Sequence, residues 1–410
     1  MKRRDFLLYT GISPLVASFL NGCSQTGGLP DSRHLVDTSG KRAAYCTKLL
    51  KELCTELGPH PIGSPELNKA ASIVKREMEL ALPDVILDTF TFERWVLNGE
   101  PELYIGERKI ESYPGHGTSG TPQDGITGVV KKIDDEGGIP YGIVNSSGEP
   151  AAYITMGSYE KAVPLPYYFF KKEVKSLPTF HVGNIDAPVI EKAVEESATV
   201  RLYADVGFIP GTSTSNVAGT LPGKSSDEII ILAHLDTVYN TVGANDNTAS
   251  VIVMIMLAHA LSGIRPEKTV TFLATTGEEY NKLGAINYVE TRRKAGTLSN
   301  IKYLVNFDSL TWGPNMQISS EDEGLRTLIE TIDRDLNLDG TPALIDRDGF
   351  QLDGRPFRET GARAMYVNSR GYDNTIVWHR PEDTPETVPL DCAEIGFQMF
   401  HEYLKRIVEW

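Results

Sequence analysis

The chain has 410 residues, of which 40% are hydrophobic and 23% are charged. These proportions are typical of a folded protein that is long enough for two domains, and they exclude a disordered chain. Lysine and arginine number 40 against 55 aspartate and glutamate residues, which gives a formal net charge of -15. Such a charge repels phosphate backbones, so we expect no nucleic acid partner.

The first segment, MKRRDFLLYTGISPLVASFLNGCSQ, predicts export. Paired Arg3 and Arg4 precede an apolar run from Phe6 to Leu20, which is shorter than the roughly 20 residues needed to cross a bilayer. RRDFL resembles the twin-arginine signal of proteins exported in folded form, and LNGC resembles the lipobox of bacterial lipoproteins. We interpret residues 1–22 as an export signal that leads to the periplasm or cell envelope. A membrane tether through a lipidated Cys23 is left open.

The remaining cysteines are too few for a disulfide scaffold in an exported protein. They are Cys46, Cys54 and Cys392. One bridge between Cys46 and Cys54 is left open, because both could lie on one helix with their side chains too far apart to bond.

Changes in residue composition and hydrophobic periodicity divide the chain into segments. Residues 23–40 read as a polar linker, followed by two stretches with the periodicity of amphipathic helices. From residue 113 to 210 the sequence changes to glycine-rich turns and short β-prone runs. We interpret 113–210 as an inserted, mainly β domain that divides a larger domain made of residues 41–112 and 211–410.

Beyond the insert, strand and helix patterns alternate to the end of the chain. The strands are nearly continuous apolar runs, which indicates a sheet covered on both faces. We therefore predict a three-layer α/β/α sandwich with a mostly parallel central sheet. The expected strands are 228–234, 268–275, 301–307 and 362–369, and the expected helices are 248–263, 283–296 and 392–410.

Side chains that can bind metal follow several of these strands. Because ligands in such sheets sit at the carboxyl ends of the strands, we expect these side chains to converge. Imidazole and carboxylate groups without thiolate suit zinc or a similar divalent ion. The candidate ligands are His234, Asp246, Glu279, Asp308 and His379.

This set has the composition required by two ions, namely one shared carboxylate and, for each ion, one histidine and one carboxylate. Adjacent side chains diverge, so one of Glu278 and Glu279 can bind metal while the other takes a proton from the water held between the ions. Asp236 follows His234 by two residues, where its carboxylate could accept the far imidazole N–H. The expected chemistry is attack of an activated water on an amide carbonyl.

Five motifs together resemble the co-catalytic zinc exopeptidases, the family of bacterial zinc aminopeptidases and glutamate carboxypeptidases. They are AHLDT, GANDNTAS, TGEEYNKLGA, VNFDS and WHRPEDTPE. The resemblance implies two zinc ions, one held by His234 and Asp308 and the other by Glu279 and His379. It also implies that Asp246 bridges the ions and that Glu278 is the general base. A further implication is that the peptide bond between Asp246 and Asn247 is cis. The insert resembles, more loosely, a protease-associated domain.

The resemblance implies a peptide substrate, and an exported zinc aminopeptidase is the first interpretation. A carboxypeptidase or dipeptidase is the main alternative, since the two branches differ in whether the cleft binds a free α-amine or a free α-carboxylate. A one-zinc glutaminyl cyclase and a non-catalytic binding protein are further alternatives, and the complete ligand set counts against both. Asp353, Arg370 and Tyr372 are weaker functional candidates, His259 and His401 are expected to pack, and His60, His116 and His181 receive no role.

Overall fold

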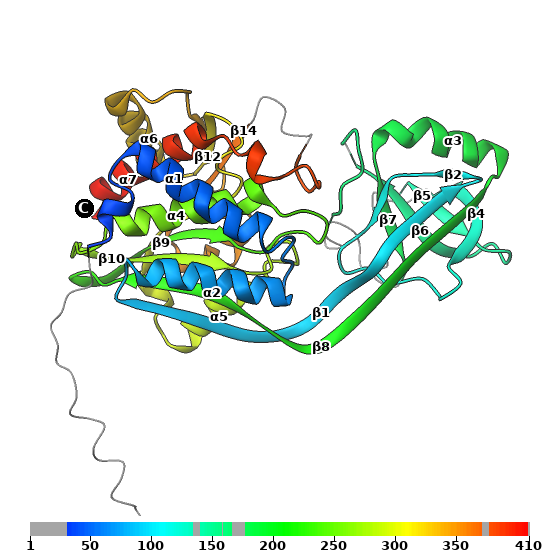
Figure 1. The fold of residues 1–410 in the computed structure, drawn as a ribbon, viewed down its shortest axis with the longest axis horizontal. Coiled ribbons are helices and arrows are strands. Elements are labelled where there is room, and N and C mark those ends of the chain that lie inside the picture. Colours follow the sequence, from blue (N-terminus) through cyan, green and yellow to red (C-terminus); the bar gives the residue numbers. More distant parts are fainter. Residues whose placement is uncertain (1–30, 134–139, 158, 166–176, 371–376, 409–410) are drawn as a thin grey trace, which may run out of the picture.

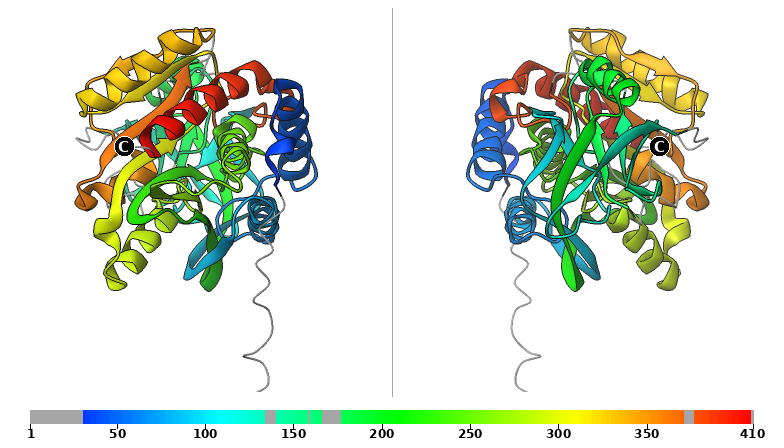
Figure 2. Two further views of the ribbon diagram at one scale, coloured as in Figure 1. Left: turned by 90° about the vertical axis from the view of Figure 1, so that its left-hand side faces the viewer. Right: turned by 90° about the vertical axis from the view of Figure 1, so that its right-hand side faces the viewer.

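The computed structural model describes residues 31–133, 140–157, 159–165, 177–370 and 377–408. The expected export signal, Cys23 and Tyr372 lie outside the described residues. Figure 1 shows a larger lobe and a smaller lobe joined by two long paired strands, and Figure 2 shows the molecule from its two ends. Among the described residues, no helix is long and apolar enough to cross a membrane.

The larger lobe contains a sheet with helices on both faces. Its helices are α1 (Ser39–Leu50), α2 (Pro65–Glu79), α4 (Ala249–Ala260), α5 (Leu283–Lys294), α6 (Glu323–Leu336) and α7 (Leu390–Val408). Its strands are β9 (Ser225–His234), β10 (Lys268–Thr275), β11 (Ile301–Phe307), β12 (Asn315–Ser319), β13 (Ala343–Ile345) and β14 (Arg363–Arg370). In the order β14-β11-β9-β10 the neighbours are parallel, while β12 pairs with β14 in antiparallel fashion.

Alternate residues of β9 pack on opposite faces of the sheet. Ile229 and Ile231 join the core formed with α1, α2, α4 and α7, whereas Ile230 joins the core formed with α5. Every residue of α4 from Ala249 to His259 is buried, because α1, α2 and α7 cover the side that faces away from the sheet. The predicted three-layer arrangement with a mostly parallel sheet is confirmed.

The smaller lobe has its own hydrophobic core, formed by residues between Leu103 and Ala204. Its elements are β2 (Arg108–Lys109), β3 (Ser112–Pro114), β4 (Ile126–Lys132), β5 (Tyr141–Val144), β6 (Pro150–Met156), β7 (Thr179–Val182) and α3 (Ala187–Glu196). Strands therefore dominate this lobe. The expected boundaries of the insert fall inside β3 and inside β8, and the division into domains stays a prediction.

Two long strands, β1 (Asp84–Ile105) and β8 (Thr199–Leu221), connect the lobes. They pair with each other in antiparallel fashion, with register shifts between Phe92 and Arg94 and between Asn98 and Glu102. The end of β8 pairs with β10 of the larger lobe, and its start pairs with β4 of the smaller one. One continuous sheet thus runs through both lobes and fixes how they meet.

Two cysteines and one histidine, Cys46, Cys54 and His259, are buried in the helical layer of the larger lobe. Cys46 and Cys54 are buried and free, so they form no bridge with each other in this structure. His259 is buried in α4, as expected, where its ring nitrogens contact Ser32 Oγ at 2.8 Å and the hydroxyl of Tyr45 at 3.1 Å.

Candidate metal centre

The carboxyl ends of the parallel strands bring six polar side chains together. His234 is the last residue of β9, Glu278 and Glu279 follow β10, and Asp308 follows β11. Asp246 lies in the turn before α4, and His379 lies in the loop after β14. All six side chains are buried, none more than 7% exposed: His234, Asp246, Glu278, Glu279, Asp308 and His379.

Asp246 lies between the two histidines and directs one carboxylate oxygen toward each. His234 Nε2 is 3.2 Å from Asp246 Oδ1, and His379 Nε2 is 3.6 Å from Asp246 Oδ2. His379 Nε2 is also 3.1 Å from Glu279 Oε1. The shared carboxylate is the feature that a pair of ions requires.

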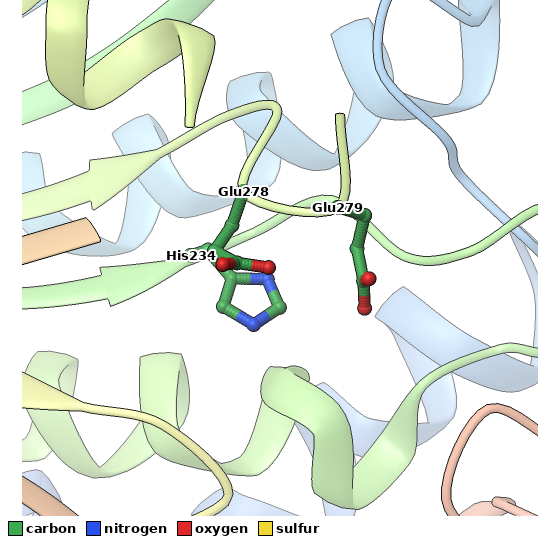
Figure 3. Close-up of side chains that lie close together, drawn as sticks. All are labelled: His234, Glu278 and Glu279. Carbon is green, nitrogen blue, oxygen red and sulfur yellow. The ribbon is translucent and has the colours of Figure 1, made fainter. Parts of the chain in front are cut away.

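Ligand atoms within 4.8 Å of one another form three groups. The first two share Asp246: His234, Asp246 and Asp308 form one, and Asp246, Glu279 and His379 form the other. The third group joins His234 to Glu278 and Glu279. Figure 3 shows Glu278 lying over the imidazole of His234 while Glu279 extends from the same turn to the side of it.

Divalent cations suit the electrostatics of this cluster. Burial, reinforced by Glu279, raises the pKa of Glu278 well above its usual range, and burial with the charge of Asp246 raises the pKa of Asp308 to about 7. Among the described residues, Glu278 Oε1 has no hydrogen-bond partner, and Asp246 Oδ1 faces His234 Nε2 at 3.2 Å without hydrogen-bond geometry. Buried carboxylates this close are costly unless positive charge is present, and the donor set of imidazole and carboxylate fits zinc.

Main-chain carbonyls orient both imidazoles. His234 Nδ1 lies 3.0 Å from the carbonyl oxygen of Asp236, and His379 Nδ1 lies 2.8 Å from that of Pro164. A carbonyl can only accept, so each Nδ1 carries a hydrogen, and each Nε2 faces the centre, where its lone pair would bind a metal ion. The predicted bond from His234 to the Asp236 carboxylate is wrong, because the main chain of Asp236 accepts instead and the carboxylate oxygen is 3.8 Å away.

The carboxylate of Asp236 holds the turn that carries both glutamates. It accepts the main-chain N–H groups of Gly277 at 2.6 Å, Glu278 at 3.1 Å and Glu279 at 3.3 Å. One residue therefore fixes His234 through its carbonyl and the two glutamates through its side chain.

Comparison with known proteins agrees with this geometry. Residues 216–403 match the model of peptidase family M28. Over this segment the chain is similar to that family. Aminopeptidase YwaD of Bacillus subtilis (strain 168) is 22% identical over 383 residues, which cover 85% of this chain and 81% of that protein. Carboxypeptidase Q of Xenopus laevis is 24% identical over 321 residues, which cover 67% of each.

Two solved structures share the fold of this chain over nearly its whole length. A peptidase M28 precursor from Shewanella amazonensis aligns with a TM-score of 0.76 at 16% identity, covering 92% of this chain and 97% of that one. A zinc aminopeptidase from Bacillus subtilis aligns with a TM-score of 0.69 at 19% identity, covering 90% and 95%. The arrangement of both lobes is therefore shared with those proteins.

The sequence analysis did not single out Asp383. Its buried carboxylate accepts the main-chain N–H groups of Asn245 at 2.9 Å and Asp246 at 3.0 Å, and also the Asn245 side-chain amide at 3.0 Å. Burial raises the pKa of Asp383 to about 6. Asp383 belongs to the WHRPEDTPE motif, so the motif contained the signal for this contact.

Asn247 was also missed, and it connects two of the candidate ligands. Its side chain donates to the carbonyl of Phe307 at 2.9 Å and accepts the N–H of Ser309 at 3.0 Å, on either side of Asp308. The peptide between Asp246 and Asn247 is cis, which confirms what the resemblance implied. Asn247 therefore holds Asp308 at a fixed position next to Asp246.

The weaker candidates lie at different places. Asp353 is buried and accepts a hydrogen bond from Thr275 at the end of β10, with its Oδ1 left without a partner. Burial raises the pKa of Asp353, and its carboxylate belongs to the same electrostatic cluster as Glu279. Arg370 ends β14, and its side chain is outside the described atoms.

Proposed function

We propose that this chain is a zinc-dependent aminopeptidase that removes amino-terminal residues from peptides. The observation that carries the proposal is Asp246, shared by two groups of three ligand atoms at the strand ends of a chain that matches a peptidase family. A metallo-exopeptidase is supported by that family and by relatives named as aminopeptidases.

In this proposal His234 and Asp308 would hold one zinc ion, Glu279 and His379 would hold the second, and Asp246 would be the ligand shared by both. When bound, the pair of ions supplies a water of lowered pKa and polarises the substrate carbonyl. The chain contributes rigid placement, because Asp236, Asn247 and Asp383 fix the ligand-bearing turns by hydrogen bonds. Fixed ligands are required because small displacements at a reacting centre cost large factors in rate.

Glu278 is the proposed general base. Its Oε1 is buried and has no hydrogen-bond partner in the part of the chain that the structure describes, and its carboxylate lies beside His234 at the centre. Glu278 accepts a proton from the attacking water and returns it to the nitrogen of the leaving amine, which completes hydrolysis of the amide.

Carboxypeptidase activity is the second candidate. Carboxypeptidase Q of Xenopus laevis is 24% identical over 321 residues, whereas the Bacillus subtilis aminopeptidase is 22% identical over 383 residues. The carboxypeptidase therefore has a slightly higher identity over a shorter match. The same cluster of ligands would serve either activity, and the groups that bind the chain end of the substrate distinguish them.

Export is also part of the proposal, and it rests on the sequence alone. The paired arginines followed by a short apolar run support transfer across the inner membrane, and the LNGC motif supports a lipid tether at Cys23. Fractionation of cells that express the full chain, comparing wild type with Cys23→Ala, would test the tether. Recovery of both proteins in the soluble envelope fraction would contradict it.

The activity test uses one short peptide in free, N-acetylated and C-amidated forms, with and without a chelator, and mass spectrometry of the products. Chelator-sensitive shortening from the amino end, blocked by acetylation alone, is the expected result. Shortening from the carboxyl end, blocked by amidation, would assign the carboxypeptidase branch. No cleavage after zinc is supplied would overturn both.

A further inference from the structure

Arg94 is a cation without a partner. It lies in β1 at the register shift opposite Ile209, where the two lobes meet. Its side chain makes no hydrogen bond and no ion pair with the residues that the structure describes, and its Nε is buried. Burial lowers the pKa of the guanidinium, which nevertheless stays protonated. A half-buried positive charge that forms no ion pair with a described residue, and that only the more distant charge of Glu66 favours, is costly to the fold, so it invites a functional explanation.

Arg94 lines a cavity of about 220 Å³. The cavity also contacts the first turn of α2, where Ser64 caps the helix and Glu66 follows. Glu66 is the one acidic residue of this lining, and it is not within ion-pair distance of Arg94. A water occupies roughly 30 Å³, so the cavity has room for part of a substrate.

The aromatic residues of the cavity have their polar groups engaged elsewhere. Trp95 Nε1 donates to the carbonyl of Thr118 at 2.8 Å, and the Tyr239 hydroxyl donates to the carbonyl of Pro114 at 2.7 Å. The His116 ring packs against that of Trp95 at an interplanar angle of 53°, with centroids 4.9 Å apart, and its buried Nδ1 has no hydrogen-bond partner among the described residues. Among the described residues, Arg94 Nε and His116 Nδ1 are thus the nitrogen atoms of this lining that have no hydrogen-bond partner.

The cavity adjoins the metal centre on the side of Glu279 and His379. The His116 ring lies 4.7 Å from the ring of Tyr280, the residue after Glu279. The main chain of His116 bonds to Leu165, and the neighbouring residue Pro164 accepts from His379 Nδ1. A substrate whose amide lies at the centre therefore extends a neighbouring group into the cavity.

We propose that Arg94 is a specificity-determining residue that binds a carboxylate of the peptide substrate next to the scissile bond. This inference rests on the proposed function and deepens it. The planar guanidinium matches a carboxylate in geometry as well as charge. The carboxylate comes either from the free carboxyl end of a very short peptide or from an acidic side chain, and the two sources are separable by experiment.

The experiment measures kcat and KM on three dipeptides: Leu-Ala, Leu-Ala-amide and Leu-Glu-amide. In Arg94→Gln, kcat/KM falls about tenfold to a hundredfold on a peptide that carries the recognised carboxylate, mainly through KM, because a charged hydrogen bond is lost. Leu-Ala-amide, which has no carboxylate, is cleaved as by wild type. Selective loss on Leu-Ala assigns the chain end, and selective loss on Leu-Glu-amide assigns the side chain.

Two further variants separate recognition from folding. Arg94→Lys keeps the charge and recovers part of the selectivity, while Arg201→Gln, an exposed arginine on the paired strand β8, leaves all three substrates unchanged. Equal loss on all three substrates, or no loss on any, overturns the role of Arg94 and leaves the peptidase proposal standing.

A binding measurement covers the case in which wild type cleaves nothing. The same peptides are titrated calorimetrically into metal-free protein, with no turnover required. Tighter binding of a carboxylate-bearing peptide by wild type than by Arg94→Gln supports the inference even if the peptidase proposal fails. Equal binding by both proteins contradicts it.

Discussion

At the scale of single residues, Glu278 is the side chain whose loss separates chemistry from metal binding. Glu278→Gln keeps the shape of the side chain and leaves the five proposed ligands in place, so zinc content should equal that of wild type. Turnover should fall about 10²–10⁴-fold, the contribution typical of a general base. Metal analysis and single-substrate kinetics on one preparation check both statements, and full activity would remove the assignment.

Asp236 makes a different prediction, because it positions the glutamate turn and touches no substrate. Asp236→Asn replaces an acceptor of three main-chain N–H groups by an amide that has one oxygen and an N–H₂ group facing those donors. We expect a loss of about 10–100-fold in zinc affinity or kcat/KM, as for other groups that orient metal ligands. Zinc titration checks this against Asp205→Asn, an exposed aspartate in β8, which should behave as wild type.

The candidate ligands could be predicted from the sequence because each follows a strand of a parallel sheet or starts the helix after it. The acceptor of the hydrogen bond from His234 could not be predicted. Asp236 has both a main-chain carbonyl and a carboxylate that can accept, and the path of the main chain determines which of them lies next to the imidazole. The role proposed for Arg94 and the neighbouring His116 could not be predicted from the sequence either. It depends on buried nitrogen atoms that have no hydrogen-bond partner among the described residues, which only the packed structure reveals.

At the scale of elements, α4 is the most sensitive helix, because sheet and helices enclose it. Ile255 is fully buried, so Ile255→Ala should lower the free energy of unfolding by about 2–5 kcal/mol. Ile286 in α5 is 40% exposed, and Ile286→Ala should cost well under half of that. Urea unfolding of both variants checks the contrast, and equal losses would contradict the enclosed position of α4.

Strands β9, β10, β11 and β14 and helices α4, α5 and α7 were predicted close to their observed bounds, since apolar runs and hydrophobic periodicity indicate buried strands and helices directly. Strands β12 and β13 were not predicted. The sequence analysis did not predict β1 as a strand of 22 residues or α6 as a helix. In β1 the burial pattern alternates only in part, because the strand passes from one lobe to the other and its two faces change neighbours. Long-range pairing with β8, rather than local pattern, sets its length.

At the scale of the whole molecule, β1 and β8 make the lobes depend on each other. The smaller lobe also reaches the centre directly, since the carbonyl of Pro164 orients His379 and that of Ala162 accepts from Arg380 at 2.7 Å. A centre assembled from both lobes requires their relative position to be fixed. The continuous sheet supplies that rigidity and leaves the cavity at Arg94 on the line where they meet.

Acid sensitivity of the whole fold follows from His259, which is remote from the metal centre. Tyr45 donates its one hydroxyl hydrogen to Glu77 at 2.7 Å, so it accepts from His259 Nε2, and Ser32 donates to Nδ1. Burial lowers the pKa of His259 to about 4, although the charge of Glu77 opposes this and those of Lys48 and His34 reinforce it. The neutral ring is therefore part of the folded state.

The sign of the effect follows from proton binding. Between the usual histidine pKa of about 6.5 and about 4, the unfolded chain binds a proton at this position and the folded chain does not. The free energy of unfolding should therefore fall as pH is lowered through this range, by at most about 1.4 kcal/mol per pH unit from this one group. Urea unfolding of metal-free wild type and His259→Gln between pH 7 and pH 4.5 measures the difference in slope. Since glutamine does not titrate, the variant should lose less stability toward low pH, and parallel curves would show that His259 does not couple folding to protons.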